Sequence, residues 1–348
     1  MAQENAHAGR QVVRFGVRLV SVALALALAC LAAVVQPAEA SFPGRSGLIA
    51  FTREGPPLLF SFDPPEGAQT IWLADPRSGR SRQLTHVSAR CRRSSGWSWM
   101  DSEPSFSASG RLVVYTHLDG CDSRTPDGIY AIRSDGSGRR LIRRATSDVE
   151  FLANPGLSPS GGLLAFNILD GPTFITSFRR PQRERELSVE PYDSTGQPAW
   201  SSTGRLALTL GRSDSSDDRG HIGTVTGAGK DPRLVTRSNR DRAPDWSPTG
   251  ERIAFHREKD VGAGLKADVL TARARGERRP IRLTAIREAY FPVWSPTGRK
   301  IAFVRSPFLS ESESSGSLWI MRARDGRRQR LVTPDVALSP ISWQPLPR

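Results

Sequence analysis

The chain has 348 residues, a formal net charge of +14 and only three cysteines. This length allows one large domain with a sizeable core and leaves little room for a second. The basic residues are spread along the whole chain, and all are arginine except Lys230, Lys259, Lys266 and Lys300. This spread argues against a nucleic-acid binder, which gathers its charge in one stripe. It favours attraction to acidic surfaces such as anionic glycans or lipid headgroups.

The first 40 residues are predicted to be a secretory signal peptide. A basic flank is followed by an apolar run over residues 19–35 and then by the small-x-small sequence that ends at Ala40; the flank consists of Arg10, Arg14 and Arg18. This order is typical of a cleaved export signal. The alternative is a membrane anchor, because a run of about 17 residues lies at the lower limit for spanning a bilayer. Cleavage before Ser41 would leave residues 41–348 as the mature domain.

A repeated phrase organises that domain. Residues 294–298 read Trp-Ser-Pro-Thr-Gly, and the apolar run 301–303 follows them. Versions of the phrase recur 43 to 51 residues apart and begin at Phe106, Leu157, Trp200, Trp246, Trp294 and Trp343. Serine, proline and glycine occupy the first, second and fourth places of a type I turn, so each phrase predicts a hairpin. A period in the forties with four short strands per repeat is typical of a β-propeller.

Four strands are expected in each repeat. The first ends at the phrase, and the second is an alternating run such as 48–52, 113–115, 164–166, 206–208, 253–255 and 301–303. The third is a short apolar run such as 71–73, 129–131 or 318–320, and the fourth often ends in Leu-Thr or Val-Thr. Residues 341–343 look like a first strand with no second strand after it. We therefore expect an all-β, six-bladed propeller whose ring is closed by the C-terminal strand pairing into the first blade, since an open ring exposes two sheet edges.

The predicted connections differ between the two faces of such a ring. The turns between first and second strands, and between third and fourth strands, are uniformly short; we call their side the short-turn face. The connections from second to third strands, and from one repeat to the next, are long and irregular, and they define the long-loop face. Long variable loops on a rigid scaffold are where binding usually resides, so the sequence predicts a binding site on the long-loop face.

The repeat also carries a family resemblance. Proline precedes the phrase by two residues in Pro244-Asp245-Trp246 and Pro292-Val293-Trp294, and Ile-Ala-Phe follows it. This pattern resembles the TolB-type periplasmic β-propellers and covers about residues 42–345. The family turn is usually Ser-Pro-Asp-Gly, and threonine replaces the aspartate here. TolB also carries a separate α/β domain, for which this chain has no room. The resemblance implies a propeller scaffold that binds a protein partner at the cell envelope or outside the cell.

Cys91 and Cys121 are the only cysteines of the predicted mature domain, and their loops are expected to emerge on the same face. In an oxidising compartment such a pair predicts a disulfide. A zinc site that also uses His86 and His117 is the alternative, although its spacings match no familiar zinc pattern.

Two further groups are candidates for partner binding. Trp97 and Trp99 are the only tryptophans outside the repeat pattern; they either anchor a partner or pack their insertion against the blade. Glu103, Asn154 and Gln197 each lie three residues before a phrase, where the first strand should enter the central channel. They form a polar ring over half the circle, or else an ordinary water-lined channel wall.

No catalytic constellation is visible in the sequence. It has no Gly-x-Ser-x-Gly elbow, and the histidines are scattered over different repeats. We therefore expect a monomeric, non-enzymatic scaffold that is exported to the periplasm, the cell envelope or the medium. It should need no cofactor or metal and bind no nucleic acid, and its only membrane contact should be the signal peptide before cleavage. The alternative function is a glycan-binding or polysaccharide-cleaving, lyase-type propeller.

Overall fold

The structure is a computed structural model. It describes residues 42–57, 67–89, 91, 99–120, 125–147, 150–169, 171–181, 183–212, 220–261, 265–276, 279–307 and 315–347. All of them belong to one of the two compact units of the chain, Glu39–Arg348. The predicted signal peptide, Trp97 and Cys121 lie outside the described residues. Within the described ranges, no helix has the length and apolar character needed to cross a membrane.

The described residues form an all-β structure of consecutive antiparallel hairpins. The first three repeats contain β1 (Arg45–Pro57), β2 (Gly67–Ala74), β3 (Ser81–Gln83), β4 (Trp99–Phe106), β5 (Leu112–Asp119), β6 (Gly128–Arg133), β7 (Arg140–Arg144), β8 (Leu152–Leu157), β9 (Leu163–Ile168), β10 (Thr173–Ser177) and β11 (Arg185–Glu186). The others contain β12 (Ser194–Trp200), β13 (Arg205–Gly211), β14 (His221–Thr226), β15 (Arg233–Leu234), β16 (Asp241–Trp246), β17 (Arg252–Asp260), β18 (Leu265–Arg273), β19 (Ile281–Arg282), β20 (Ala289–Trp294), β21 (Lys300–Arg305), β22 (Ser315–Arg322), β23 (Arg330–Ala337) and β24 (Ser342–Leu346).

These strands make four separate four-stranded sheets and one eight-stranded sheet. The separate sheets are β8–β11, β12–β15, β16–β19 and β20–β23. The eight-stranded sheet holds two antiparallel runs, β24-β1-β2-β3 and β4-β5-β6-β7, which one parallel bridge between Gln69 and Met100 joins. The structure therefore has four separate blades rather than the expected six, because this bridge fuses the remaining eight strands into one sheet.

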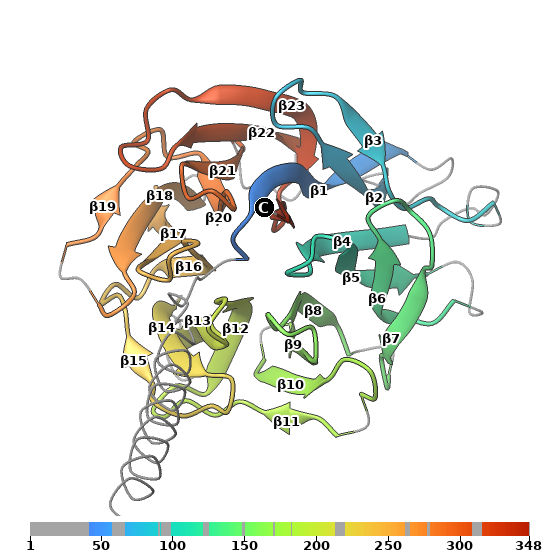
Figure 1. Cartoon of the computed structure of the whole chain (residues 1–348), viewed down its shortest axis with the longest axis horizontal. Helices are drawn as coiled ribbons and strands as arrows, with labels where there is room; N and C mark the ends of the chain where they lie inside the picture. The colour runs from blue at the N-terminus through green and yellow to red at the C-terminus, as the bar shows by residue number, and fades with distance from the viewer. Residues whose placement is uncertain are drawn as a thin grey trace, which may run out of the picture. The chain divides into compact units, whose positions relative to one another are not determined.

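The first strands of the repeats surround a central channel. β4 contacts β8, β8 contacts β12, β12 contacts β16, β16 contacts β20, and β20 contacts β24, which in turn contacts β4. In Figure 1 these strands lie innermost, and the fourth strands, such as β7, β11, β15 and β19, lie at the rim. The propeller arrangement that the repeats predict is thus present.

The predicted pairing at the end of the chain is also present. β24 pairs antiparallel with β1, with Trp343 opposite Ile49 and Ser342 opposite Ala50. The side chain of Ser342 accepts a hydrogen bond from the backbone N–H of Phe106 at 3.0 Å, and Gln344 donates to the carbonyl of Gly110 at 2.7 Å. The C-terminal strand is therefore joined both to β1 and to the hairpin of the second repeat.

The repeated phrase forms the turn that its residues predict. In the last repeat the N–H of Gly298 donates to the carbonyl of Ser295 at 2.8 Å, and Gly298 has a φ of 68°. The Ser295 hydroxyl accepts the N–H of Lys300 at 3.0 Å and lies 3.2 Å from the hydroxyl of Thr297. Threonine therefore keeps a side-chain oxygen where the family has aspartate.

The turns between third and fourth strands lock neighbouring repeats together. Gly79 and Gly326 have left-handed φ angles of 75° and 68°. A Cβ on Gly326 would lie 1.9 Å from the carbonyl oxygen of Leu283 in the fifth repeat. A Cβ on Gly79 in the first repeat would lie 2.8 Å from the carbonyl oxygen of Val332 in the last repeat, which is its neighbour around the ring. Glycine is thus required twice over, by the turn and by the neighbour.

The Leu-Thr and Val-Thr endings that recur in this chain have a local explanation. The hydroxyl of Thr85 accepts the backbone N–H of Ile71 at 3.0 Å, and Thr236 and Thr284 do the same for Ile222 and Val269. Each threonine therefore satisfies a buried donor of the third strand, which would otherwise lack a partner.

Candidate binding channel

A cavity of about 140 Å³ opens along the channel axis. Its wall comes from the first strand of every repeat and includes the large apolar rings of Phe106, Trp200, Phe291, Trp294 and Trp343. The predicted ring residues Glu103, Asn154 and Gln197 all line it. Among the described residues that line it, Glu103 and Asp245 are the only ionisable ones, so this part of the channel is apolar with an acidic character.

A backbone irregularity shapes this wall. Glu103, Asn154, Gln197, Ala243 and Phe291 all have positive φ, between 47° and 56°. Each precedes a proline, and the strand register shifts at each of these pairs. The left-handed region is unfavourable for residues with side chains, and a residue before proline normally takes an extended conformation. Five strained bulges therefore ring the channel, and strain of this kind concentrates where the backbone is shaped for a task.

Hydrogen bonds connect the bulges of neighbouring repeats. The N–H of Asn154 donates to Glu103 Oε2 at 2.5 Å, and the Thr116 hydroxyl donates to the same oxygen at 3.3 Å. The N–H of Ala243 donates to Gln197 Oε1 at 2.8 Å, as does the Thr209 hydroxyl at 2.9 Å. Glu103 Oε2 and Gln197 Oε1 are therefore each used to join two repeats.

Two residues that the sequence analysis missed continue these links. Asn167 Oδ1 accepts the side-chain N–H of Asn154 at 3.0 Å and the backbone N–H of Gln197 at 3.4 Å. His256 Nδ1 accepts the N–H of Phe291 at 3.4 Å. Both follow the buried aromatic of a second strand, at a position where three other repeats have Thr52, Thr116 or Thr209 and the last has Val304. A polar residue directly after Phe166 or Phe255 was the available signal.

A third missed residue, Asp245, lies between the last two repeats. Its Oδ2 accepts the backbone N–H of Trp294 at 2.6 Å. The indole Nε1 of Trp200 and that of Trp246 each donate to a carbonyl of the preceding repeat, at 3.1 and 3.0 Å. The buried Nε1 of Trp294 has no such partner among the described residues. The wall beside Asp245 thus holds an acceptor and an unused donor.

Burial changes the proton affinity of both channel carboxyls. Desolvation raises the pKa of Glu103, against the effect of its hydrogen bonds from Asn154 and Thr116. It raises the pKa of Asp245 from 3.8 to about 7, although the N–H groups of Trp294 and Trp246 favour the charged form. Desolvation therefore outweighs hydrogen bonding at both sites.

Trp99, predicted as a candidate anchor, is a packed residue. Only 4% of it is exposed, and its Nε1 donates to Asp101 Oδ2 at 3.2 Å. Its ring meets the fully buried His117 edge-on at 4.7 Å, and His117 Nδ1 lies 2.6 Å from Asp101 Oδ1. A side chain this covered offers little surface to a partner, so its position supports the packing role and leaves Trp97 as the candidate anchor.

The same cluster contains Cys91. It is 2% exposed and packs with Ala68 and Trp99, and its Sγ lies 3.6 Å from Asp119 Oδ1. His86 is exposed, whereas His117 is buried. Within the described ranges, no group of three or more histidine, cysteine or acidic side chains is placed to hold a metal.

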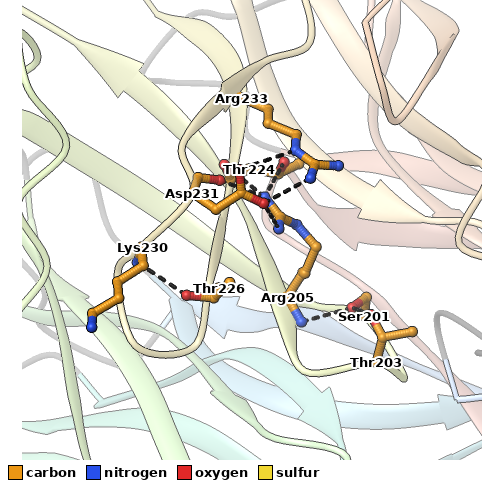
Figure 2. Close-up of polar contacts among 8 residues, drawn as sticks. All are labelled: Ser201, Thr203, Arg205, Thr224, Thr226, Lys230, Asp231 and Arg233. Carbon is orange, nitrogen blue, oxygen red and sulfur yellow. Dashed lines mark hydrogen bonds and ion pairs between the residues drawn. The ribbon is translucent and has the colours of Figure 1, made fainter.

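On the short-turn face some arginines are held by acids. Asp231, half exposed, bonds Arg205 at 2.8 Å and Arg233 at 2.7 Å, as Figure 2 shows. Arg205 also donates to Thr224, and its backbone N–H donates to the turn hydroxyl of Ser201 (Figure 2). The hydrogen bonds that Arg205 and Arg233 donate to the Asp231 carboxylate lower its pKa below the usual range.

The comparisons with known proteins agree with this architecture. No family model matches the chain. The curated "Protein TolB homolog" of Chlorobium chlorochromatii is 29% identical over 127 residues, which are 36% of this chain and 28% of that protein. TolB from Acinetobacter baumannii superposes with a TM-score of 0.62 at 16% identity, over 86% of this chain and 67% of that one. A chain from a nidogen–laminin complex gives 0.59 at 12% identity, over 85% and 98%. The resemblance to TolB-like β-propellers that the repeats predict is therefore confirmed.

Proposed function

We propose that this chain is an exported, six-bladed TolB-like propeller that binds a protein partner over its long-loop face and catalyses no reaction. The count of six follows when the eight-stranded sheet is taken as two blades, since a single parallel bridge joins its halves. Export is supported by the basic flank, apolar run and cleavage sequence of residues 1–40. The periplasm or cell envelope is supported by the TolB resemblance, and a monomer is the form in which we expect the protein to act.

The observation that carries this proposal is the rigid channel. Its wall is fixed by five strained bulges that hydrogen bonds connect from repeat to repeat. A surface that is already ordered loses little conformational entropy on binding, which favours affinity. Apolar rings such as Trp200, Phe291 and Trp294 dominate the wall, with Glu103 and Gln197 as its polar points. Such a surface is suited to a partner segment that is mainly apolar.

The loops around the channel mouth supply the rest of the proposed site. Trp99 is the first residue of β4 and packs against Ala68, Cys91 and His117, which fixes the start of this strand, and Trp97 lies two residues before it. We place Trp97 as the aromatic anchor of the partner, and we propose a Cys91–Cys121 disulfide that holds the insertion in place. A precedent for protein binding by a similar fold is the matched chain that comes from a nidogen–laminin complex.

Site-specific crosslinking tests the proposal. A photo-reactive residue replaces Arg287, which is exposed on the long-loop face, or Thr297, which is exposed on the short-turn face. The full chain is expressed in its native host, and crosslinked proteins are identified by mass spectrometry. We expect a specific protein adduct from position 287, lost in the Trp97→Ala variant, and none from position 297. A protein adduct from position 297 alone would refute the assignment of the face.

A further inference from the structure

The fold gathers basic side chains that the sequence spreads evenly. Each turn between a third and a fourth strand carries at least one, and all these turns lie on the short-turn face: Arg77, Arg139, Arg179, Lys230, Arg275 and Arg327. Basic residues that are spread evenly along the chain, at least one per repeat, therefore become a ring when the repeats close on themselves.

In most repeats the two short turns, one before the second strand and one after the third, are hydrogen-bonded to each other. In five repeats a backbone N–H just after the third strand donates to the carbonyl just before the second strand, for example Ala323 to Arg299 at 3.1 Å and Ala274 to Glu251 at 2.8 Å. Both kinds of turn therefore end together in each repeat. The contact of Gly326 with the carbonyl of Leu283 fixes the last repeat against its neighbour in the same way. The arginines thus extend from a rigid and even surface.

Several of these cations are unpaired. Arg139 donates to the Tyr115 hydroxyl, and Asp325 holds Arg322. By contrast, the side chains of Arg179, Arg180, Arg275, Arg327 and Arg328 are exposed and make no hydrogen bond or ion pair within the described part of the chain. Arg77 is exposed too, and its charge helps to lower the pKa of Asp75. The free cations therefore come from the third, fifth and sixth repeats of the ring.

We propose that the short-turn face docks onto a bilayer that contains anionic phospholipids. Guanidinium groups bind phosphate oxygens in pairs, which suits arginine better than lysine. An even surface with charge on all sides matches a plane of headgroups, whereas a single acidic polymer chain is better matched by a basic groove, and the channel lining contains no basic residue. The exposed apolar residues Leu141, Leu234, Ile281 and Leu331 lie within fourth strands, and Leu163, the first residue of β9, adjoins a turn of this face. The contact is therefore mainly electrostatic, at the depth of the headgroups.

Docking in this way sets the orientation of the molecule. The short-turn and long-loop faces lie at opposite ends of every sheet, so the channel mouth and its loops would point away from the bilayer. This inference does not depend on the proposed protein partner. A protein without any partner could still bind the lipid, and the reverse also holds.

Co-sedimentation with vesicles tests this inference. The full chain is mixed with vesicles of phosphatidylcholine alone or of phosphatidylcholine with phosphatidylglycerol. We expect stronger binding to the second kind, and loss of this difference in high salt, since the screening length falls from about 10 Å at 0.1 M to about 3 Å at 1 M. The apolar N-terminal run is common to all variants, and its own contribution appears on the neutral vesicles.

A matched pair of variants locates the surface. Arg327→Glu with Arg328→Glu changes the short-turn face. Arg237→Glu with Arg287→Glu makes the same change in charge on exposed long-loop positions, and Arg328 and Arg287 share left-handed φ angles of 57° and 56°. At about 1 kcal/mol per basic residue near an anionic surface, we expect the first pair to weaken binding by about thirtyfold or more. The second pair should stay close to wild type.

Three results would overturn the inference. Equal losses in both pairs would mean that only net charge matters. Equal binding to neutral vesicles would mean that the headgroup charge is not recognised. Binding to a soluble acidic polysaccharide with no binding to anionic vesicles would assign the face to a glycan.

A second pair of variants on the same face repeats the test. Arg179→Glu with Arg180→Glu should weaken binding to anionic vesicles as much as Arg327→Glu with Arg328→Glu.

Discussion

Replacing Asp245 by asparagine should make the protein more stable at neutral pH. Burial raises the pKa of this carboxyl from 3.8 to about 7. Between these two values the folded protein keeps a proton that the unfolded chain releases. The free energy of unfolding therefore falls as the pH rises through this window, and the loss is complete above the folded-state pKa. At about 1.4 kcal/mol per pH unit, the interval is worth at most about 4 kcal/mol.

Asparagine separates this proton effect from the structural contact. Its Oδ1 can still accept the N–H of Trp294, but it has no proton to lose. In urea titrations from about pH 4 to pH 8, the stability of Asp245→Asn minus that of wild type should rise from near zero towards this limit. Asp231→Asn is the control with the opposite sign, because its partners lower the pKa of Asp231: that variant should lose stability at neutral pH, and the loss should fade in acid. A flat difference curve for Asp245→Asn would refute the reasoning.

Three further predictions concern the ring and its insertion. Deleting residues 341–348 removes β24 and leaves one edge of β1 without its partner strand, so the truncated protein should aggregate or melt far below wild type; melting at the wild-type temperature would contradict the role of β24. Trp200→Phe leaves the carbonyl of Gly156 without its indole donor, whereas Trp294→Phe breaks no such bond, so denaturant titration should show the first to be more costly by about 1 kcal/mol. Equal losses would show that the indole bond contributes nothing. Non-reducing peptide mapping of exported protein should find Cys91 linked to Cys121, a bond expected to contribute about 3–4 kcal/mol, and two alkylatable thiols would rule it out.

The sequence predicts the repeat well because each repeat is encoded locally. The phrase at Trp294 contains its own turn, and the structure has the predicted bond between Gly298 and Ser295. The closing pair of β24 and β1 was also predictable, since residues 341–343 repeat a first strand that the start of the domain lacks. The number of separate sheets was not predictable. It depends on one bridge between Gln69 and Met100, and neither residue belongs to the repeat pattern.

The channel was predicted only in part. Counting from the phrases found Glu103, Asn154 and Gln197, because the period places equivalent residues on one circle. It did not find Asn167 or Asp245, whose roles depend on which backbone N–H of the next repeat lies opposite them. Nor did it reveal the left-handed backbone at these positions, since a proline after glutamate or asparagine normally predicts an extended residue. Contacts between repeats are set by their packing angle, which no local pattern encodes.

The glycines of the short turns restrict how such a molecule can diverge. A side chain at Gly326 would collide with the carbonyl of Leu283, so this turn can neither take a larger residue nor lengthen without displacing the neighbouring repeat. After a duplication, one end of every copy would stay under the same steric control, whatever selection acts on the other end. Insertions would then accumulate in the long loops, whereas the short turns could change only at exposed positions such as Arg327, which leave the backbone of the turn as it is. The two faces of one ring would record different histories: changes of length on one side, and changes of surface charge on the other.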